Sequence, residues 1–255
     1  MIKISNNAVT KDKLANLYSI NSVESRILNK LFLSKKVYVY SSLNELKFQL
    51  DLQINISNTA KDLYNSNLLF KVFRKSKCNH TYWEHTSEGG FQLKKEAKPS
   101  EAIKDIFING SKYGTECATA IVIIYYKALL NVFKEKLFNE MFPKIYLFNW
   151  HYIDSNLYIE DLRYEQDTMV GDCKYFKNPD VNPLTPEWQG ENTIYLGYGN
   201  YYGHGLGIRS ENKIIKGLNS HRKIGAKKSS FLLSSVTRLN YKRLYNMYYN
   251  YFSKP

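Results

Sequence analysis

The longest apolar stretch of the chain lies between Glu116 and Leu130, and Lys127 is the only charge between Cys117 and Leu130. The stretch is apolar on nearly every face of a helical wheel, which is typical of a helix at the centre of a domain. Its many β-branched residues would also suit a buried strand, but buried strands rarely exceed about eight residues. The stretch is too short, and too closely flanked by charges, for us to expect a membrane span. It therefore predicts a buried central helix.

The remaining pattern predicts helices before this stretch and strands after it. The helices are expected at 43–54, where Ser42 and Glu45 have capping-box spacing, at 68–73 and at 99–107. A short strand at 37–40 and a hairpin at 81–94 interrupt them, and strands follow at 144–150, 169–176, 192–197 and 201–208. This order predicts an α+β fold, in which the buried helix packs on an antiparallel sheet. We expect one domain over 1–255, least defined at 1–35 and in the Tyr-rich amphipathic tail at 241–255.

The chain is basic, with a formal net charge of +13. Such a charge suggests an anionic partner, although an excess of lysine is more often solvated surface. Neither of the two densest basic patches carries a nucleic-acid-binding motif. The patches are Lys71, Arg74, Lys75 and Lys77, and Arg222, Lys223, Lys227 and Lys228. We interpret both as surface, with docking to an acidic assembly as the alternative, and expect no nucleic-acid or membrane partner.

The three cysteines, Cys78, Cys117 and Cys173, have neither metal-binding nor redox spacing. His80 and His85 lie near Cys78, but the spacing matches no metal site. We therefore expect no metal and no cofactor. The first residues lack an apolar core, so we expect no secretory signal and synthesis in the cytoplasm.

Cys117 is the first candidate for chemistry. Residues 109–115 have the composition of a loop, so Cys117 falls in the first turn of the central helix. The helix dipole would stabilise a thiolate there, and free amides could hold an oxyanion. The alternative is that Cys117 is a small buried apolar residue, as most free cysteines are.

Glu191 and His204 are the candidate partners of Cys117. A hairpin that turns near residue 198 would place 191–194 opposite 201–204, so both side chains could face the start of the central helix. Gly203 and Gly205 flank His204, and glycine in a strand often marks a close approach. Taken singly, His204 suits a structural histidine and Glu191 a turn carboxylate. Together with Cys117 they form a papain-like arrangement.

Several segments resemble the bacterial spore-coat transglutaminases, the protein-glutamine gamma-glutamyltransferases of endospore formers. They occur in order between about residues 36 and 240. They are GTECATAIVIIYY (114–126), NWHY (149–152), GDCKYFKNP (171–179), WQGEN (188–192), HGLGI (204–208), LNS with Arg222 (218–222), and LLS with TRL (232–239).

The resemblance implies a calcium-independent transglutaminase with a papain-like, NlpC/P60-like core. It places the nucleophile at Cys117 and its catalytic partners at Glu191 and His204. Glu116 also matches, either in an auxiliary role or as a helix N-terminal carboxylate. The family's aromatic tunnel would correspond to Phe70, Trp150 and Trp188, although core packing would also account for the tryptophans.

The implied activity is an ε-(γ-glutamyl)lysine crosslink formed through a cysteine thioester with release of ammonia. Its partners would be glutamine- and lysine-bearing spore coat proteins, and its destination the spore coat. We expect a monomer. One alternative is a cysteine peptidase or amidase of the same fold, although here the acid precedes the histidine. The other is a non-catalytic basic coat component.

Overall fold

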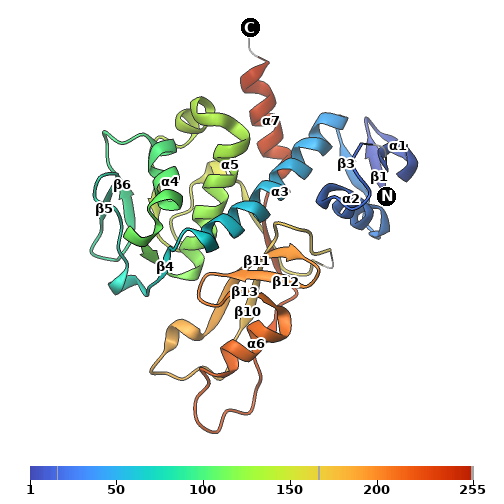
Figure 1. The fold of residues 1–255 in the computed structure, drawn as a ribbon. Helices are drawn as coiled ribbons and strands as arrows, with labels where there is room; N and C mark the ends of the chain where they lie inside the picture. The colour runs from blue at the N-terminus through green and yellow to red at the C-terminus, as the bar shows by residue number, and fades with distance from the viewer. Residues whose placement is uncertain (16, 166, 254–255) are drawn as a thin grey trace.

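Helix α5 (Cys117–Met141) is the buried central helix that the sequence predicts, and it lies against the antiparallel sheet (Figure 1). The computed structural model describes residues 1–15, 17–165 and 167–253. α5 is longer than predicted because its apolar face continues through Phe133, Leu137 and Phe138. By length and composition it could cross a membrane, but 72% of its most apolar window is buried inside the protein. α5 is therefore built as a core helix.

Three helices pack around α5. They are α3 (Leu43–Asn65), α4 (Pro99–Ile108) and α7 (Tyr241–Phe252). The predicted cap is present at α3, where Ser42 Oγ accepts a hydrogen bond from Glu45 N at 3.2 Å. α7 is the amphipathic tail, and Leu244 and Tyr245 bury its apolar face. The core thus contains both the predicted central helix and the tail.

The main sheet has the strand order β13-β12-β11-β10-β15-β9, with β14 beside β10, and every pairing is antiparallel. Its strands are β9 (Ile159–Leu162), β10 (Cys173–Lys177), β11 (Gly190–Gly197), β12 (Asn200–Gly203), β13 (Gly207–Ser210), β14 (Phe231–Leu232) and β15 (Val236–Leu239). Cys173 and Ile194 face the core around α5, whereas Phe176 and Tyr201 pack under α6 (Glu211–Asn219). The sheet therefore lies between α5 and α6. Its packing against α5 is as predicted, whereas α6 was not predicted.

Two predicted elements near the site are wrong. The expected strand over 201–208 is two strands, β12 and β13, because a turn at 204–206 separates them and Gly207 has a φ of 77°. The expected helix over 68–73 is instead strand β4 (Leu69–Phe70) and a 3₁₀ turn at Phe73–Lys75. β4 pairs in parallel with β7 (Gly114–Thr115), directly before α5, and this pairing satisfies its backbone.

The remaining elements lie outside the main sheet. The hairpin β5 (Trp83–His85) and β6 (Phe91–Leu93) is as predicted, and the expected strand at 144–150 is only β8 (Tyr146–Leu147) beside it. Further 3₁₀ turns are Gly110–Lys112, Ser155–Leu157 and Pro186–Trp188. The N-terminal segment forms β1 (Ile2–Ile4), β2 (Asn7–Val9), α1 (Lys11–Ala15), α2 (Val23–Leu33) and β3 (Tyr38–Tyr40).

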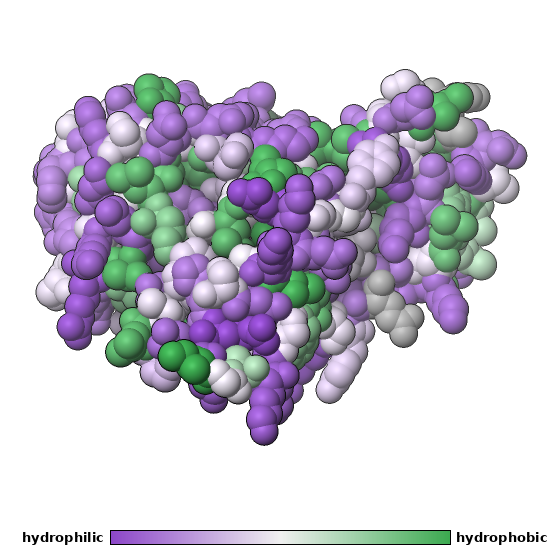
Figure 2. All heavy atoms as spheres, turned by 60° about the horizontal axis from the view of Figure 1, so that its bottom comes forward, coloured by the Kyte–Doolittle hydropathy of each residue, from purple (hydrophilic) through white to green (hydrophobic). Residues whose placement is uncertain are grey.

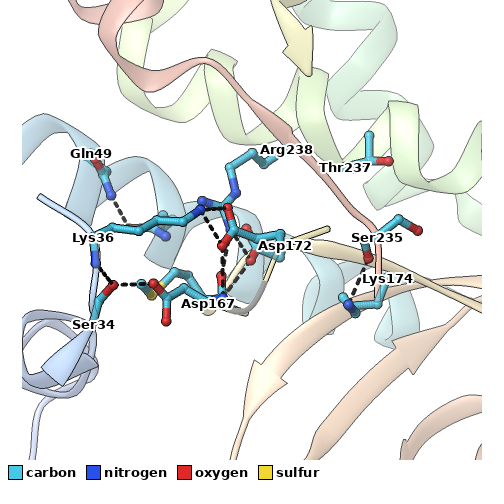
Figure 3. Close-up of polar contacts among 12 residues, drawn as sticks. Ser34, Lys36, Gln49, Asp167, Asp172, Lys174, Ser235, Thr237 and Arg238 are labelled. Carbon is cyan, nitrogen blue, oxygen red and sulfur yellow. Dashed lines mark hydrogen bonds and ion pairs between the residues drawn. The ribbon is translucent and has the colours of Figure 1, made fainter. Parts of the chain in front are cut away.

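A polar network joins this N-terminal segment to the sheet (Figure 3). Lys36 Nζ contacts the Glu165 carboxylate at 2.6 Å, and Tyr38 donates to Asp167 at 2.9 Å. Arg238 of β15 donates to the buried Asp172 at 2.7 Å. Because a buried charge is unfavourable without a partner, Asp172 depends on Arg238.

Candidate active site at the start of helix α5

Cys117 is the first residue of α5, as the sequence predicts, but the helix amides beside it are occupied. Glu116 is the N-cap, and its carboxylate accepts hydrogen bonds from Ala118 N at 2.5 Å and Thr119 N at 2.8 Å. A carboxylate at this place is favoured by the helix dipole. These two amides are therefore not free to hold an oxyanion, which corrects that part of the expectation.

The thiol of Cys117 is neutral at rest. Burial, followed by the negative charges of Glu191 and Glu116, raises its pKa well above the ordinary value, and the Asn192 amides oppose this only in part. The side-chain Nδ2 of Asn192 lies 3.4 Å from the Cys117 Sγ. The expected thiolate is thus wrong for the resting protein, because burial and the nearby carboxylates together keep the pKa of the thiol high. Cys117 must lose its proton to a base before it can attack.

Glu191 is buried at the start of β11, with 1% of its surface exposed. Its Oε1 accepts a hydrogen bond from Gly205 N at 3.0 Å. A Cβ atom at Gly203 would lie 2.8 Å from the Glu191 Cγ, so the glycine does mark a close approach, as predicted. Burial is the main reason that the pKa of Glu191 rises to about 8. A carboxyl group with this pKa can exchange a proton near neutral pH.

His204 lies in the turn between β12 and β13 rather than on a strand. Its Nε2 is 3.1 Å from the Leu69 carbonyl oxygen, and its Nδ1 is 3.0 Å from the Tyr202 hydroxyl. Burial lowers the pKa of His204 to about 4, so the imidazole is neutral. A neutral imidazole has one N–H, which the carbonyl requires at Nε2, so Nδ1 accepts from Tyr202. His204 thus ties its turn to β4.

The three predicted catalytic residues, Cys117, Glu191 and His204, do not form a hydrogen-bonded triad. Within the described ranges no hydrogen bond joins Cys117 to Glu191 or to His204. Successive residues of a strand point to opposite faces, and Asn192 rather than Glu191 contacts the sulfur. Glu191 is nevertheless near enough for its charge to raise the pKa of Cys117.

Two of the three predicted aromatic residues cover Glu191. The ring centroids of Phe70 and Trp188 are 5.3 Å apart. A Cβ at Gly205 would lie 3.2 Å from both Glu191 Oε2 and Trp188 Cη2, and 3.3 Å from Phe70 Cε2. The aromatic pair therefore packs beside the carboxylate and reduces its contact with water.

Trp150, the third predicted aromatic residue, follows a residue that contacts the first turn of α5. Its neighbour Asn149 donates its backbone N–H to Thr119 Oγ1 at 2.8 Å, and Thr119 Oγ1 donates in turn to Glu116. The Trp150 ring packs against the main core. Among the residues that the structure describes, no aromatic pair joins it to Phe70 or Trp188.

Sequence reasoning missed Asn192, Tyr175 and Tyr202. Asn192 and Tyr175 are opposite one another on β11 and β10. Burial, with smaller effects of Cys117 and Glu191, raises the pKa of Tyr175 to about 12. Strand alternation could have identified Asn192, because it follows Glu191. Tyr202 could not be assigned, because its contact depends on the turn that carries His204.

Acyl transfer through a thiol needs a sheltered cysteine, a proton acceptor and restricted water, and this region of the fold offers all three. Comparison with known proteins agrees with that class. The family model for protein-glutamine gamma-glutamyltransferase matches residues 1–248. The chain belongs to this family and is a transglutaminase, an acyltransferase.

The relatives support the assignment over most of the chain. A Bacillus cereus (strain 03BB102) protein-glutamine gamma-glutamyltransferase is 45% identical over 217 residues, covering 85% of this chain and 78% of the relative. A Bacillus mycoides (strain KBAB4) protein of the same name is 46% identical with the same coverage. A solved transglutaminase from Geobacillus stearothermophilus, without its C-terminal extension, has a TM-score of 0.77 and 47% identity. It covers 81% of this chain and 98% of that structure.

Proposed function

We propose that this transglutaminase crosslinks spore coat proteins through a Cys117 thioester, without calcium, on a papain-like, NlpC/P60-like core. The observation that carries the proposal is the position of Cys117 at the start of α5, beside a buried Glu191 whose pKa is about 8. The coat is proposed from the resemblance to spore-coat enzymes.

In the first half-reaction, the Cys117 sulfur attacks the γ-carboxamide carbon of a glutamine. Glu191 accepts the thiol proton, directly after a side-chain rotation or through one water. The C–N bond breaks, the nitrogen takes up the proton and leaves as ammonia, and a thioester remains. Asn192, whose Nδ2 is 3.4 Å from the sulfur, is placed to donate a hydrogen bond to the oxyanion.

In the second half-reaction, a lysine amine attacks the thioester carbon. Glu191 takes a proton from the amine, the C–S bond breaks, and the sulfur regains its proton. The products are an ε-(γ-glutamyl)lysine bond and the free thiol of Cys117. The Phe70–Trp188 pair favours the amine by limiting water, which would otherwise hydrolyse the thioester.

We assign His204 a positioning role. Both its ring nitrogens are engaged, and its low pKa keeps it neutral, so it is less suited than Glu191 to accept the thiol proton. Through Leu69 it connects the glycine turn, which holds Glu191, to the β4–β7 pair that leads into α5. Glu116 supports the same geometry as the helix cap.

Amine incorporation separates this proposal from a hydrolase. Wild type and Cys117→Ala are incubated, without calcium, with a glutamine-containing protein and a fluorescent primary amine. We expect covalent label with wild type and none with Cys117→Ala, and ammonia release that matches the label. Ammonia release without covalent label would show that the protein acts as an amidase instead. Equal labelling by both proteins would remove Cys117 from the reaction.

A further inference from the structure

The two basic patches of the sequence lie on either side of the active-site aromatic pair. One, the Phe70 patch, contains Lys71, Arg74, Lys75 and Lys77. The other, the His221 patch, contains Arg222, Lys223, Lys227 and Lys228. Phe70 packs on Trp188, and Trp188 stacks on His221 with ring centroids 4.1 Å apart and planes within 6°. The aromatic residues thus connect two segments about 150 residues apart in the sequence.

The Phe70 patch is held on the segment that leads to the nucleophile. Lys71 N donates to the Thr115 carbonyl at 2.8 Å, and Lys77 N donates to the Gly114 carbonyl at 3.0 Å. Thr115 is two residues before Cys117. The Arg74 and Lys75 side chains on the 3₁₀ turn are exposed. This patch is therefore fixed in place relative to the reacting sulfur.

The His221 patch is fixed by Asp180. The Asp180 Oδ2 accepts hydrogen bonds from Lys227 N and Lys228 N, each at 2.8 Å, and the Asp180 carbonyl accepts from Lys223 N at 2.9 Å. The backbone N–H groups of the three lysines are thereby hydrogen-bonded, while their side chains remain exposed. In Figure 1 the loop that follows α6 and carries the His221 patch lies below that helix. Figure 2 shows that hydrophilic residues cover most of the face turned forward from the bottom of Figure 1.

The charges of both patches are largely unpaired. Over residues 1–15, 17–165 and 167–253, the only salt bridge of either patch is Lys223 to Asp180, at 3.9 Å. Ile224, an exposed aliphatic residue, lies on the same loop as the His221 patch, and the exposed Leu184 lies on the neighbouring loop that carries Asp180. The surface around the aromatic pair therefore offers positive charge with some apolar contact.

We propose that the Phe70 patch and the His221 patch together recognise an acidic polypeptide segment that carries the reactive glutamine. This inference rests on the proposed function and deepens it. The acyl donor is the favoured occupant because its reacting side chain is neutral, so acidic flanks can supply the attraction. A lysine acceptor in a basic segment would be repelled by the same surface. Exposed charges act over about 10 Å at 0.1 M salt, so the two patches can attract acidic residues several positions from the glutamine.

The test uses glutamine peptides that differ only in their flanks. One carries aspartates on both sides of the glutamine, one serines and one lysines. The wild-type protein and a neutral primary amine are used at low and high salt. We expect kcat/KM to be about threefold to tenfold higher for the acidic peptide than for the serine peptide, and lowest for the lysine peptide. High salt should reduce these differences.

Matched variants locate the effect. Replacing Lys223, Lys227 and Lys228 with alanine should lower the acidic-to-serine ratio toward one. Replacing the exposed Lys35, Lys136 and Lys242 with alanine removes the same charge elsewhere and should preserve the ratio. A ratio of one in wild type, or equal loss in both variants, would overturn the inference. A patch variant that loses binding to a single-stranded oligonucleotide but keeps the peptide ratio would overturn it in favour of nucleic acid.

Failure of the proposed function is distinguishable from failure of this inference. If the wild-type protein incorporates no amine into any peptide, transfer itself is absent. If it labels all three peptides equally, the acyl-transfer activity is supported and the recognition of acidic flanks by the two patches is refuted.

Discussion

Replacing Glu191 with glutamine separates its proton chemistry from its structural contact. Glutamine can still accept a hydrogen bond from Gly205 N through its side-chain oxygen, but it cannot take up a proton. As the proposed base, Glu191 should contribute on the order of 10²-fold to 10⁴-fold to the rate. Glu191→Gln should therefore reduce kcat/KM for amine incorporation by that factor, although the loss of negative charge also lowers the pKa of Cys117.

The same substitution has a measurable effect on stability. The pKa of Glu191 rises from 4.5 to about 8 in the folded protein, which corresponds to about 5 kcal/mol. Because the folded state binds the extra proton between these values, this term makes the free energy of unfolding fall as pH rises from about 4.5 to 8. Glu191→Gln removes the term, so it should gain stability relative to wild type as pH increases.

Two assays test this prediction together. Urea denaturation from pH 5 to pH 9 compares wild type, Glu191→Gln and Glu96→Gln, a matched change at an exposed position. In wild type and in Glu96→Gln, kcat/KM should rise with pH through a pKa near 8. In Glu191→Gln this rise should be absent. Stability curves that stay parallel, or a Glu191→Gln enzyme with more than a tenth of wild-type activity, would refute the reasoning.

Three further substitutions test other parts of the structure. Asp172→Asn leaves Arg238 without its charged partner and should reduce the free energy of unfolding by about 3 kcal/mol in urea denaturation; an unchanged midpoint would contradict the paired arrangement. His204→Gln should lower kcat/KM on the order of 10-fold to 100-fold while the pKa near 8 stays in the pH profile; loss of that pKa would move the base from Glu191 to His204. Gly205→Ala places a Cβ 3.2 Å from the Glu191 carboxylate and should lower kcat/KM about tenfold with a loss of stability of about 1 to 2 kcal/mol; wild-type values for both would show that the turn can adjust.

The central helix and the antiparallel sheet were predictable because their hydrophobic patterns are long and regular. The buried position of Glu191 was also predictable, because Gly203 and Gly205 on the following arm of the hairpin indicate a close approach of another group. The segment 68–73 was mispredicted because a short apolar run fits a helix or a strand equally, and only its pairing with Gly114–Thr115 decides.

The electrostatics of the site could not be predicted from the sequence order. The expected thiolate at Cys117 followed from the helix dipole alone. In the structure Glu116 occupies the first amides of α5, and burial together with the Glu191 charge raises the pKa of the thiol. These effects depend on distances across the fold.

The central claim is that Cys117 carries the acyl group, and the most direct measurement is the mass of the intact protein during turnover. Wild type and Cys117→Ala are each mixed with a glutamine peptide in the absence of an amine and quenched in acid, and the intact protein mass is measured by mass spectrometry. The account predicts a wild-type adduct equal to the peptide mass less one ammonia, located at Cys117 by digestion and lost on addition of a lysine analogue, and no adduct on Cys117→Ala. An adduct on Cys78 or Cys173, or amine incorporation by the Cys117→Ala protein, would contradict it.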